Sequence, residues 1–235
     1  MKNNLFLLII FGAIINCYSQ TSMDYFNRAV DKANHQDYQG AITEFTKAIE
    51  INPKQAQAYF NRGLAKAYIQ DYQGSILDFN KAIEMNSFNA EFYNNRGLAK
   101  TNLQDYDGAM SDFAKSVDIN PNHAITYYNR ALANQYQKNN QGALSDYSKA
   151  IEIDPKFAQA IYKRGTIKIL LEDYRGAISD FDQVIAIDSR HSEAYYGRGF
   201  CLILNSQKDQ GCMDLSKAGE LGLTKAYEAI KKFCN

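Results

Sequence analysis

Arginine recurs in this sequence at intervals of 34 residues (62 − 28 = 34), and such a series could bind carboxylates or phosphates through bidentate guanidinium groups. The series comprises Arg28, Arg62, Arg96, Arg130, Arg164 and Arg198. An equally periodic acidic series accompanies it, at Glu44, Asp78, Asp112, Asp146 and Asp180. A ligand-binding ladder would not need a matched acid in every repeat. We therefore expect structural ion pairs rather than a binding site.

Other chemistry finds little support in the sequence. No HExxH, GxSxG, phosphate-binding loop or CxxC motif is present, and His35, His123 and His191 lie far apart. The 26 basic and 26 acidic residues are interspersed, so no basic stripe is available to neutralise nucleic-acid phosphates. We expect a protein that is not an enzyme, with no cofactor, no metal site and no nucleic-acid partner.

The elements that would position these residues are set by a second 34-residue period. Glycine stands at Gly40, Gly74, Gly108, Gly142 and Gly176. The residue after each arginine is small (Ala29, Gly63, Gly97, Ala131, Gly165 and Gly199), and Tyr25, Tyr59, Tyr93, Tyr127 and Tyr195 lie three positions before an arginine. A fixed period of this length is typical of a chain that stacks one helical hairpin repeatedly.

A second set of columns completes the pattern. Phe45, Phe79, Phe113, Tyr147, Phe181 and Leu215 share one column, and Ala48, Ala82, Ser116, Ala150, Val184 and Ala218 follow three residues later. Pro53, Pro121 and Pro155 close three repeats. The sequence resembles the tetratricopeptide repeat (TPR) family over residues 22 to 221, in six motifs at the family's spacing. The resemblance implies an all-α fold, a right-handed α-solenoid of helical hairpins.

The expected repeats are 22–55, 56–89, 90–123, 124–157, 158–191 and a divergent 192–222, followed by a capping helix in 223–235. In the second repeat, helix A is predicted from about Gln57 to Gln70, and Asp71 is placed to cap helix B. The small Gly63 should let the two helices approach closely. One departure from the family is the turn glycine, which is replaced by Gln36, Gln70, Gln104, Lys138, Glu172 and Ser206.

The resemblance also implies a concave groove lined by helix A side chains. The predicted groove residues are aromatic or amide: Phe26, Asn27, Phe60, Asn61, Tyr68, Asn94, Asn95, Tyr128, Asn129, Tyr136, Tyr162 and Tyr196. Amides can pair with a peptide backbone, and tyrosine offers contact area at a low entropy cost. The expected partner is a segment of a protein. The charged residues with which one TPR subfamily clamps a C-terminal carboxylate are absent from these columns.

The C-terminal part departs from the repeat. Ile169, Leu170, Phe200, Ile203 and Leu204 form a possible apolar patch, which either binds a partner or is buried by neighbouring side chains. Gly211 comes one residue late (211 − 176 = 35), which predicts a longer turn. Thr224 is a predicted N-cap for the capping helix, which should cover the open end of the stack. If that helix is antiparallel to the preceding one, Cys234 can form a disulfide with Cys212, whereas Cys201 reads as a small buried hydrophobic residue.

The N-terminal residues 1–19 resemble a signal peptide. Lys2 precedes an apolar run from Leu5 to Ile15, which is too short to span a bilayer but has the length of a signal-peptide core. Small residues at Cys17 and Ser19 favour cleavage after Ser19, and the alternative is a lipid anchor at Cys17. We expect an exported protein that is periplasmic or secreted and has no membrane span.

The leading hypothesis is therefore an exported, non-catalytic interaction scaffold that holds a peptide segment in its concave groove. Two other classes remain open. The chain could be an architectural accessory subunit of a cell-envelope complex, or it could bind a glycan or another small molecule through its tyrosine and asparagine columns.

Overall fold

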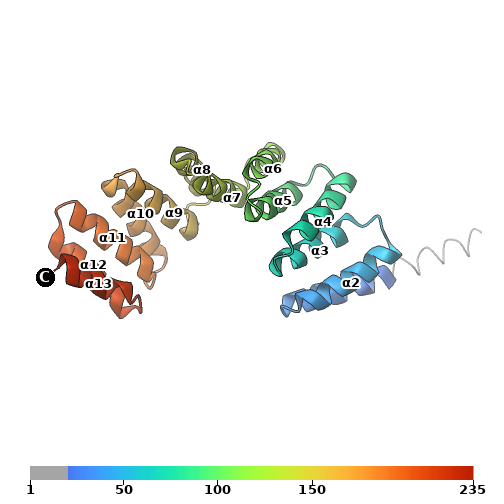
Figure 1. Ribbon diagram of the computed structural model, residues 1–235, viewed down its shortest axis with the longest axis horizontal. Helices are drawn as coiled ribbons and strands as arrows, with labels where there is room; N and C mark the ends of the chain where they lie inside the picture. The colour runs from blue at the N-terminus through green and yellow to red at the C-terminus, as the bar shows by residue number, and fades with distance from the viewer. Residues whose placement is uncertain (1–20, 235) are drawn as a thin grey trace, which may run out of the picture. The chain divides into compact units, whose positions relative to one another are not determined.

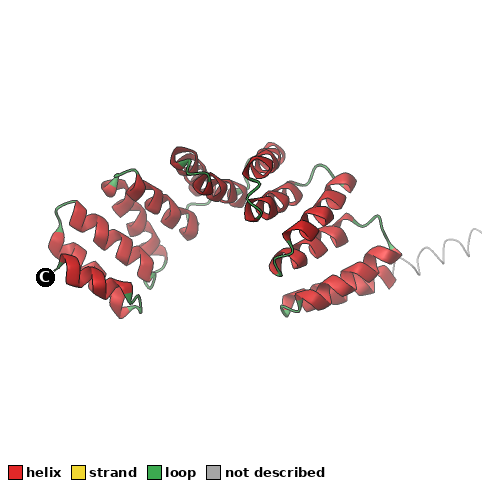
Figure 2. Ribbon diagram, in the orientation of Figure 1, coloured by secondary structure: helices red, strands yellow, loops and turns green. Residues whose placement is uncertain are grey.

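The computed structural model describes residues 21–234, which form helices joined by short turns and contain no strand (Figures 1 and 2). The chain forms two compact units that divide between Pro121 and Asn122. The expected all-α fold of stacked hairpins is confirmed.

The first unit contains a helix over residues 21–34, followed by α2 (Tyr38–Ile51), α3 (Ala56–Tyr68), α4 (Tyr72–Met85), α5 (Ala90–Asn102) and α6 (Tyr106–Ile119). Helices that follow one another in the chain pack side by side, from α2 to α6, and α3 also reaches α5. The core lies between them. Phe79, for example, is fully buried and packs with Phe60 and Phe92.

The second unit contains α7 (Ala124–Tyr136), α8 (Asn140–Ile153), α9 (Ala158–Leu170), α10 (Tyr174–Ile187), α11 (Ser192–Leu204), α12 (Lys208–Glu220) and α13 (Lys225–Phe233). Neighbours in sequence again pack against one another, and α13 packs on α12 as the predicted cap. A 2.04 Å bond joins the sulfurs of Cys212 and Cys234, the pair expected from the sequence, and Cys201 is fully buried.

The recurring glycine marks the first turn of the second helix in each of five hairpins. The Asp71 carboxylate precedes α4 and accepts a 2.9 Å hydrogen bond from the Gly74 backbone nitrogen, so it is the predicted N-cap. A methyl group on Gly74 would collide with this carboxylate. Asp37, Asp105, Asn139 and Asp173 make the same cap in the other four hairpins.

The turns between the paired helices explain where the first helix of each hairpin ends. Gln70 has a φ of +64°, so α3 ends at Tyr68 rather than at the predicted Gln70. The Asp71 nitrogen donates to the Lys66 carbonyl and the Gln70 nitrogen to the Ala67 carbonyl, which satisfies the last carbonyls of α3. All six residues predicted to replace the turn glycine have this left-handed conformation: Gln36, Gln70, Gln104, Lys138, Glu172 and Ser206.

One prediction about the C-terminal part is wrong, and a second holds for the position of the residue alone. Gly211 does not lengthen its turn, because α12 begins at Lys208, which is 34 residues after the Tyr174 that begins α10 (208 − 174 = 34). Gly211 instead takes the place of Ala177 in the repeat, and a Cβ there would lie 2.6 Å from the Gly199 carbonyl oxygen. Thr224 precedes α13, but its side chain makes no capping hydrogen bond because its own backbone is already helical.

Candidate functional site

The arginine series forms structural ion pairs, as predicted. In the second repeat, the Arg62 Nε and Nη2 donate to the two Asp78 carboxylate oxygens at 2.9 and 2.6 Å, and the Lys66 Nζ lies 2.8 Å from the same carboxylate. Equivalent pairs are Arg28–Glu44, Arg96–Asp112, Arg130–Asp146, Arg164–Asp180 and Arg198–Asp214. The hydrogen bond to Asp146 raises the pKa of Arg130 and so favours the charged guanidinium. Each of these arginines is already paired with a carboxylate of the protein. The series therefore does not bind a ligand.

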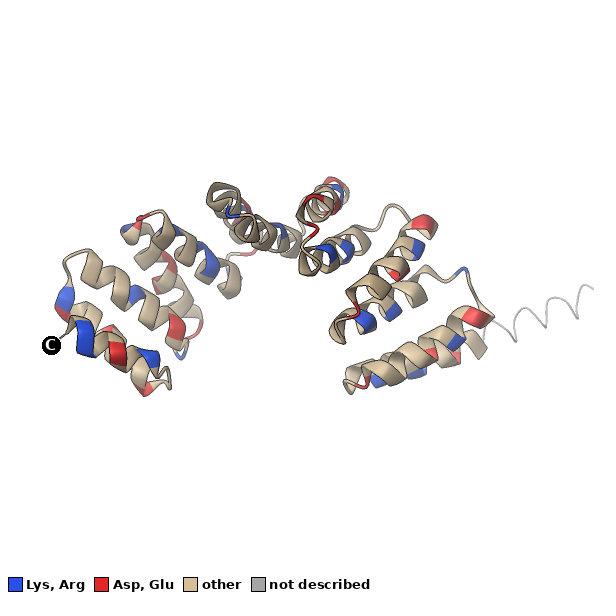
Figure 3. Cartoon of the chain, viewed as in Figure 1, with Lys and Arg blue, Asp and Glu red and all other residues tan. Residues whose placement is uncertain are grey.

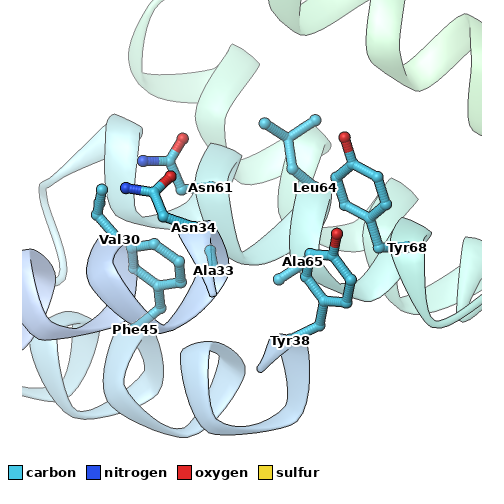
Figure 4. Close-up of a pocket in the computed structure, with 9 residues that line it drawn as sticks. All are labelled: Val30, Ala33, Asn34, Tyr38, Phe45, Asn61, Leu64, Ala65 and Tyr68. Atoms are coloured by element: carbon cyan, nitrogen blue, oxygen red, sulfur yellow. The ribbon is translucent and has the colours of Figure 1, made fainter. Parts of the chain in front are cut away.

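A different surface offers space for a partner. In the first unit, a cavity of about 250 Å³ opens between the helix over residues 21–34 and α3 (Figure 4). Its walls consist of aliphatic, aromatic and amide side chains. The lining residues are Val30, Ala33, Asn34, Tyr38, Phe45, Asn61, Leu64, Ala65 and Tyr68.

A second cavity of about 250 Å³ lies one repeat further along, between α3 and α5. It is lined by Leu64, Ala67, Tyr68, Tyr72, Phe79, Asn95, Leu98, Ala99 and Asn102. Each of these nine residues stands 34 positions after one of the nine that line the first cavity (for example, 64 − 30 = 34 and 102 − 68 = 34). The two cavities are therefore the same site, repeated once. We refer to them together as the twin cavities.

Tyr68 stands between the twin cavities and lines both of them. Its ring stacks on that of Tyr38, with the centroids 4.5 Å apart and the planes 5° from parallel, and Figure 4 shows the two rings side by side. The side chain is nevertheless 67% exposed. A ring that is held in place and open to solvent can bind a partner without much loss of conformational entropy.

The twin cavities carry no charged residue. Lysine, arginine, aspartate and glutamate are interspersed elsewhere on the helices (Figure 3). The side-chain amides of the lining asparagines are therefore the groups that could form hydrogen bonds with a ligand. Asn95 and Asn102 donate their nitrogens to the Glu91 and Leu98 carbonyls of their own helix, which leaves their side-chain oxygens as acceptors.

The first cavity has the complementary arrangement. The Asn61 side-chain oxygen accepts a 3.2 Å hydrogen bond from the Gln57 amide, which leaves its nitrogen as a donor. The Asn34 side chain has no hydrogen-bond partner among residues 21–234, so it can both donate and accept. Figure 4 shows both amides on the side of the cavity away from the tyrosines.

The structure places the predicted groove residues unequally. Tyr68, Asn61 and Asn95 line the twin cavities. Phe26 is half-buried against Phe45, and Asn27 is exposed, and neither lines a cavity.

Three predicted groove residues are wrong because they are buried: Phe60, Asn94 and Asn129 are 4, 4 and 5% exposed. Phe60 packs between Phe79 and Phe92, with ring centroids 5.7 and 4.8 Å away, so it belongs to the core of the first unit. A substitution at Phe60 would therefore test folding and not partner binding.

The predicted residues of the second unit lie mostly in packing contacts. Tyr128 contacts Tyr147 and Phe157, and Tyr162 contacts Phe181. Burial raises the pKa of Tyr128, with a smaller effect of Tyr136, and burial likewise raises the pKa of Tyr162. Tyr136 is 64% exposed. The Tyr196 ring is half-buried beneath the Lys225 ammonium, 4.6 Å from the ring centroid.

The possible apolar patch at the C-terminal end also contains both exposed and partly buried residues. Leu170 and Leu204 are exposed, whereas Ile169, Phe200 and Ile203 are partly buried. The Phe233 ring of α13 lies 6.0 Å from the Phe200 ring, in an edge-on contact. The capping helix therefore contacts part of this patch and leaves Leu170 and Leu204 open.

The site residues that sequence reasoning missed most clearly are Tyr38 and Tyr72. Each follows the N-cap aspartate of the second helix and lines one of the twin cavities. A signal was present, because tyrosine follows the cap aspartate in four of the hairpins, as Tyr38, Tyr72, Tyr106 and Tyr174. The predicted groove contains residues of the first helix of each hairpin alone.

Within residues 21–234, no helix is long and apolar enough to span a bilayer. The same part of the chain contains no group of three or more His, Cys, Asp or Glu side chains that could hold a metal ion.

Sequence profiles of known families match most of the repeats. A profile described as TPR repeat matches residues 35–69, and profiles described as tetratricopeptide repeat match 56–89, 90–123, 124–157 and 158–191. The chain belongs to the tetratricopeptide repeat family. TPR arrays are usually non-catalytic modules that bind other proteins, so a general role in protein interaction follows. No curated protein matches the chain.

Solved TPR structures share the fold. YrrB, described as a TPR protein with an unusual peptide-binding site, is 23% identical, with a TM-score of 0.66 over 80% of this chain and 97% of YrrB. PilF of Pseudomonas aeruginosa is 14% identical, with a TM-score of 0.78 over 92% of this chain and 98% of PilF. A TPR protein from Parabacteroides merdae is 18% identical, with a TM-score of 0.65 over 92% of this chain and the whole of that protein.

Proposed function

We propose that this TPR protein is a non-catalytic scaffold that binds a peptide segment of a partner protein at the twin cavities of its first unit. The observation that carries the proposal is the exposed Tyr68, which stands between two uncharged cavities that also present amide donors and acceptors. Such a surface can hold apolar side chains and pair with a peptide backbone at the same time. The description of YrrB as having a peptide-binding site supports a peptide as the ligand.

The size of the cavities favours a peptide over a glycan or another small molecule. Pockets that enclose drug-sized ligands usually have volumes of about 300–1,000 Å³. Each of the twin cavities is smaller, at about 250 Å³, and open to solvent on one side. A space of this size suits a single side chain of a longer ligand.

A second candidate function, an architectural contact through the outer surface, rests on a specific observation as well. Leu77 on α4 is 66% exposed, and Phe88, in the turn before α5, is 84% exposed. Leu77 lies nearly opposite the buried Phe79 around the helix, so it points away from the twin cavities. A partner that docks on this outer face would make the chain an accessory subunit of a larger complex.

Photo-crosslinking from two positions separates these functions. A photoreactive phenylalanine analogue replaces Tyr68 in one variant and Leu77 in the other, and mass spectrometry locates the crosslinked peptide in the native partner. Peptide binding predicts crosslinks from position 68 to one continuous segment and few from position 77. Crosslinks from position 77 alone would contradict groove binding and support the architectural role.

We further propose that the protein is exported. The apolar run from Leu5 to Ile15 and the small residues Cys17 and Ser19 support this, although they lie outside the described residues. The Cys212–Cys234 disulfide suits an oxidising compartment. Mass spectrometry of the protein from its native host should find Gln20 at the N-terminus. A chain that begins at a lipid-modified Cys17 would show that the exported protein is lipid-anchored and is not cleaved after Ser19. A native chain that retains Met1 would contradict export.

A further inference from the structure

The chemistry of the twin cavities narrows the class of peptide. We infer that the first unit recognises an uncharged segment in the polyproline II conformation, with a proline or small apolar residue at every third position. This inference rests on the proposed function. Its starting point is that the twin cavities repeat residue for residue, because a binding site with a translational repeat fits a ligand with a repeat of the same length.

The spacing of the helices sets that length. The twin cavities are offset by one hairpin, that is by the step from α3 to α5, and these two helices contact each other directly. The axes of helices in contact lie about 8–10 Å apart. A polyproline II helix has three residues per turn and advances about 3.1 Å per residue, so residues i and i+3 share a face at about 9 Å. In an extended strand the next residue on the same face lies only about 7 Å away. The polyproline II repeat therefore matches the cavities and the strand repeat does not.

The four asparagines distinguish polyproline II from an α-helix. A helical ligand could also place two residues about 10 Å apart, at i and i+7. Its backbone groups would already be hydrogen-bonded within the helix. A polyproline II backbone makes no internal hydrogen bonds, so its N–H and C=O groups are free. The Asn95 and Asn102 oxygens can accept from such N–H groups, and the Asn61 nitrogen can donate to such a C=O group.

The aromatic wall and the absence of charge fit the same ligand. Proline-rich segments dock in grooves lined by aromatic rings, and they lose little entropy because their conformation is already fixed. The stacked pair of Tyr38 and Tyr68 forms such a wall for the first cavity, and Tyr68 serves the second. A charged ligand side chain would find no counter-charge among the lining residues, so an uncharged segment is complementary to them.

Fluorescence anisotropy with the purified, disulfide-bonded protein tests this inference. The probe is a fluorescein-labelled, N-acetylated and C-amidated peptide of five Pro-Ala-Ser units. One comparison peptide has the same composition but no two prolines three positions apart. A second replaces each alanine by aspartate, and a third is an alanine-rich helix with leucines seven positions apart.

We expect the Pro-Ala-Ser peptide to bind at least tenfold more tightly than each comparison peptide. Tyr68→Ala should weaken this binding at least tenfold. Leu77→Ala is the matched control, because Leu77 is about as exposed as Tyr68 but lies outside the twin cavities, and it should change binding by less than twofold. Both variants remove exposed side chains, and equal melting temperatures would show that both are folded.

Equal binding of the peptide without the three-residue period, or tighter binding of the helical peptide, would overturn the inference. The experiments distinguish failure of this inference from failure of the proposed function. A crosslink from position 68 to a native segment that lacks the period would overturn only the inference, whereas crosslinks from position 77 alone would overturn both.

Discussion

At the residue scale, six side-chain-bearing residues hold a backbone conformation that favours glycine. Gln36, Gln70, Gln104, Lys138, Glu172 and Ser206 have φ values between 60° and 64°. A left-handed residue with a Cβ costs roughly 1–2 kcal/mol. This conformation occurs once in each hairpin and places the next residue at the N-cap position of the following helix. Asp71, for example, caps α4 in this way.

This strain predicts that Gln70→Gly stabilises the protein. Relief of the left-handed strain should outweigh the extra entropy of an unfolded glycine, and we expect a gain of about 0.5–1 kcal/mol. Urea denaturation measures the free energy of unfolding. Gln183→Gly is the control, because Gln183 is exposed within α10, and glycine there should cost about 1 kcal/mol. A loss of stability in Gln70→Gly would contradict this explanation of the turn.

A second residue-scale prediction concerns Cys201. Burial raises the pKa of this thiol to about 12, so the reactive thiolate is scarce near pH 8. In a protein that begins at Gln20, Cys201 is the single cysteine outside the disulfide. We expect a thiol reagent at pH 8 to modify the folded protein at least 100-fold more slowly than the guanidinium-unfolded protein. Similar rates would show that Cys201 is accessible.

At the element scale, close approach of the two helices in a hairpin depends on a small residue. A Cβ added to Gly97 in α5 would lie 2.9 Å from a ring carbon of Phe113 in α6. Gly63 has the same relation to Phe79, at 2.7 Å. The aromatic ring of one helix therefore packs directly on the backbone of the other.

Gly97→Leu should overpack this contact and lower the free energy of unfolding by about 1–3 kcal/mol. The comparison is Ala114→Leu, which adds the same leucine to the exposed side of α6 and should change stability by less than about 0.5 kcal/mol. Thermal unfolding followed by circular dichroism measures both variants. An unchanged melting temperature for Gly97→Leu would contradict the packing argument.

The capping helix carries the second element-scale prediction. The Cys212–Cys234 bond closes a loop of 22 residues and ties the end of α13 to α12. Replacing both cysteines by serine should reduce the stability of α13 by up to about 3 kcal/mol. Hydrogen exchange should then become faster in α13, while the Met213→Ser control, which leaves the bond intact, should exchange like the parent protein. Unchanged exchange in the double variant would show that packing alone holds the cap.

The packing of one helix on another also explains how far the sequence could predict the structure. Periodic columns predicted the hairpins, the Asp71 cap and the ion pairs, because each depends on residues at a fixed spacing in the chain. The cysteine pair was predicted from the antiparallel packing of the capping helix on the helix before it. The periodic columns did not separate Phe60, which is buried, from Tyr68, which is exposed, although both were expected in the groove. That difference depends on how α3 meets Phe79 and Phe92 on neighbouring helices, and the period of one helix does not contain that information.

At the scale of the whole molecule, recurring and variable residues have separate roles. The ion pairs, caps and small residues recur in nearly every hairpin and stabilise the contacts between neighbours, as expected for an array in which each repeat packs mainly on the next. The positions that differ from one repeat to the next are available to recognise a partner. Asn34, Tyr68 and Asn102 occupy one column, and their alternation places Tyr68 between two amides in the twin cavities.

Binding of a partner at the twin cavities can be tested on the protein itself. The most direct measurement is the comparison of photo-crosslinks from positions 68 and 77, with the partner peptide located by mass spectrometry. We expect position 68 to label one continuous, uncharged segment of a partner protein and position 77 to label little. Labelling from position 77 alone would contradict this expectation and would place the interaction on the outer face of α4.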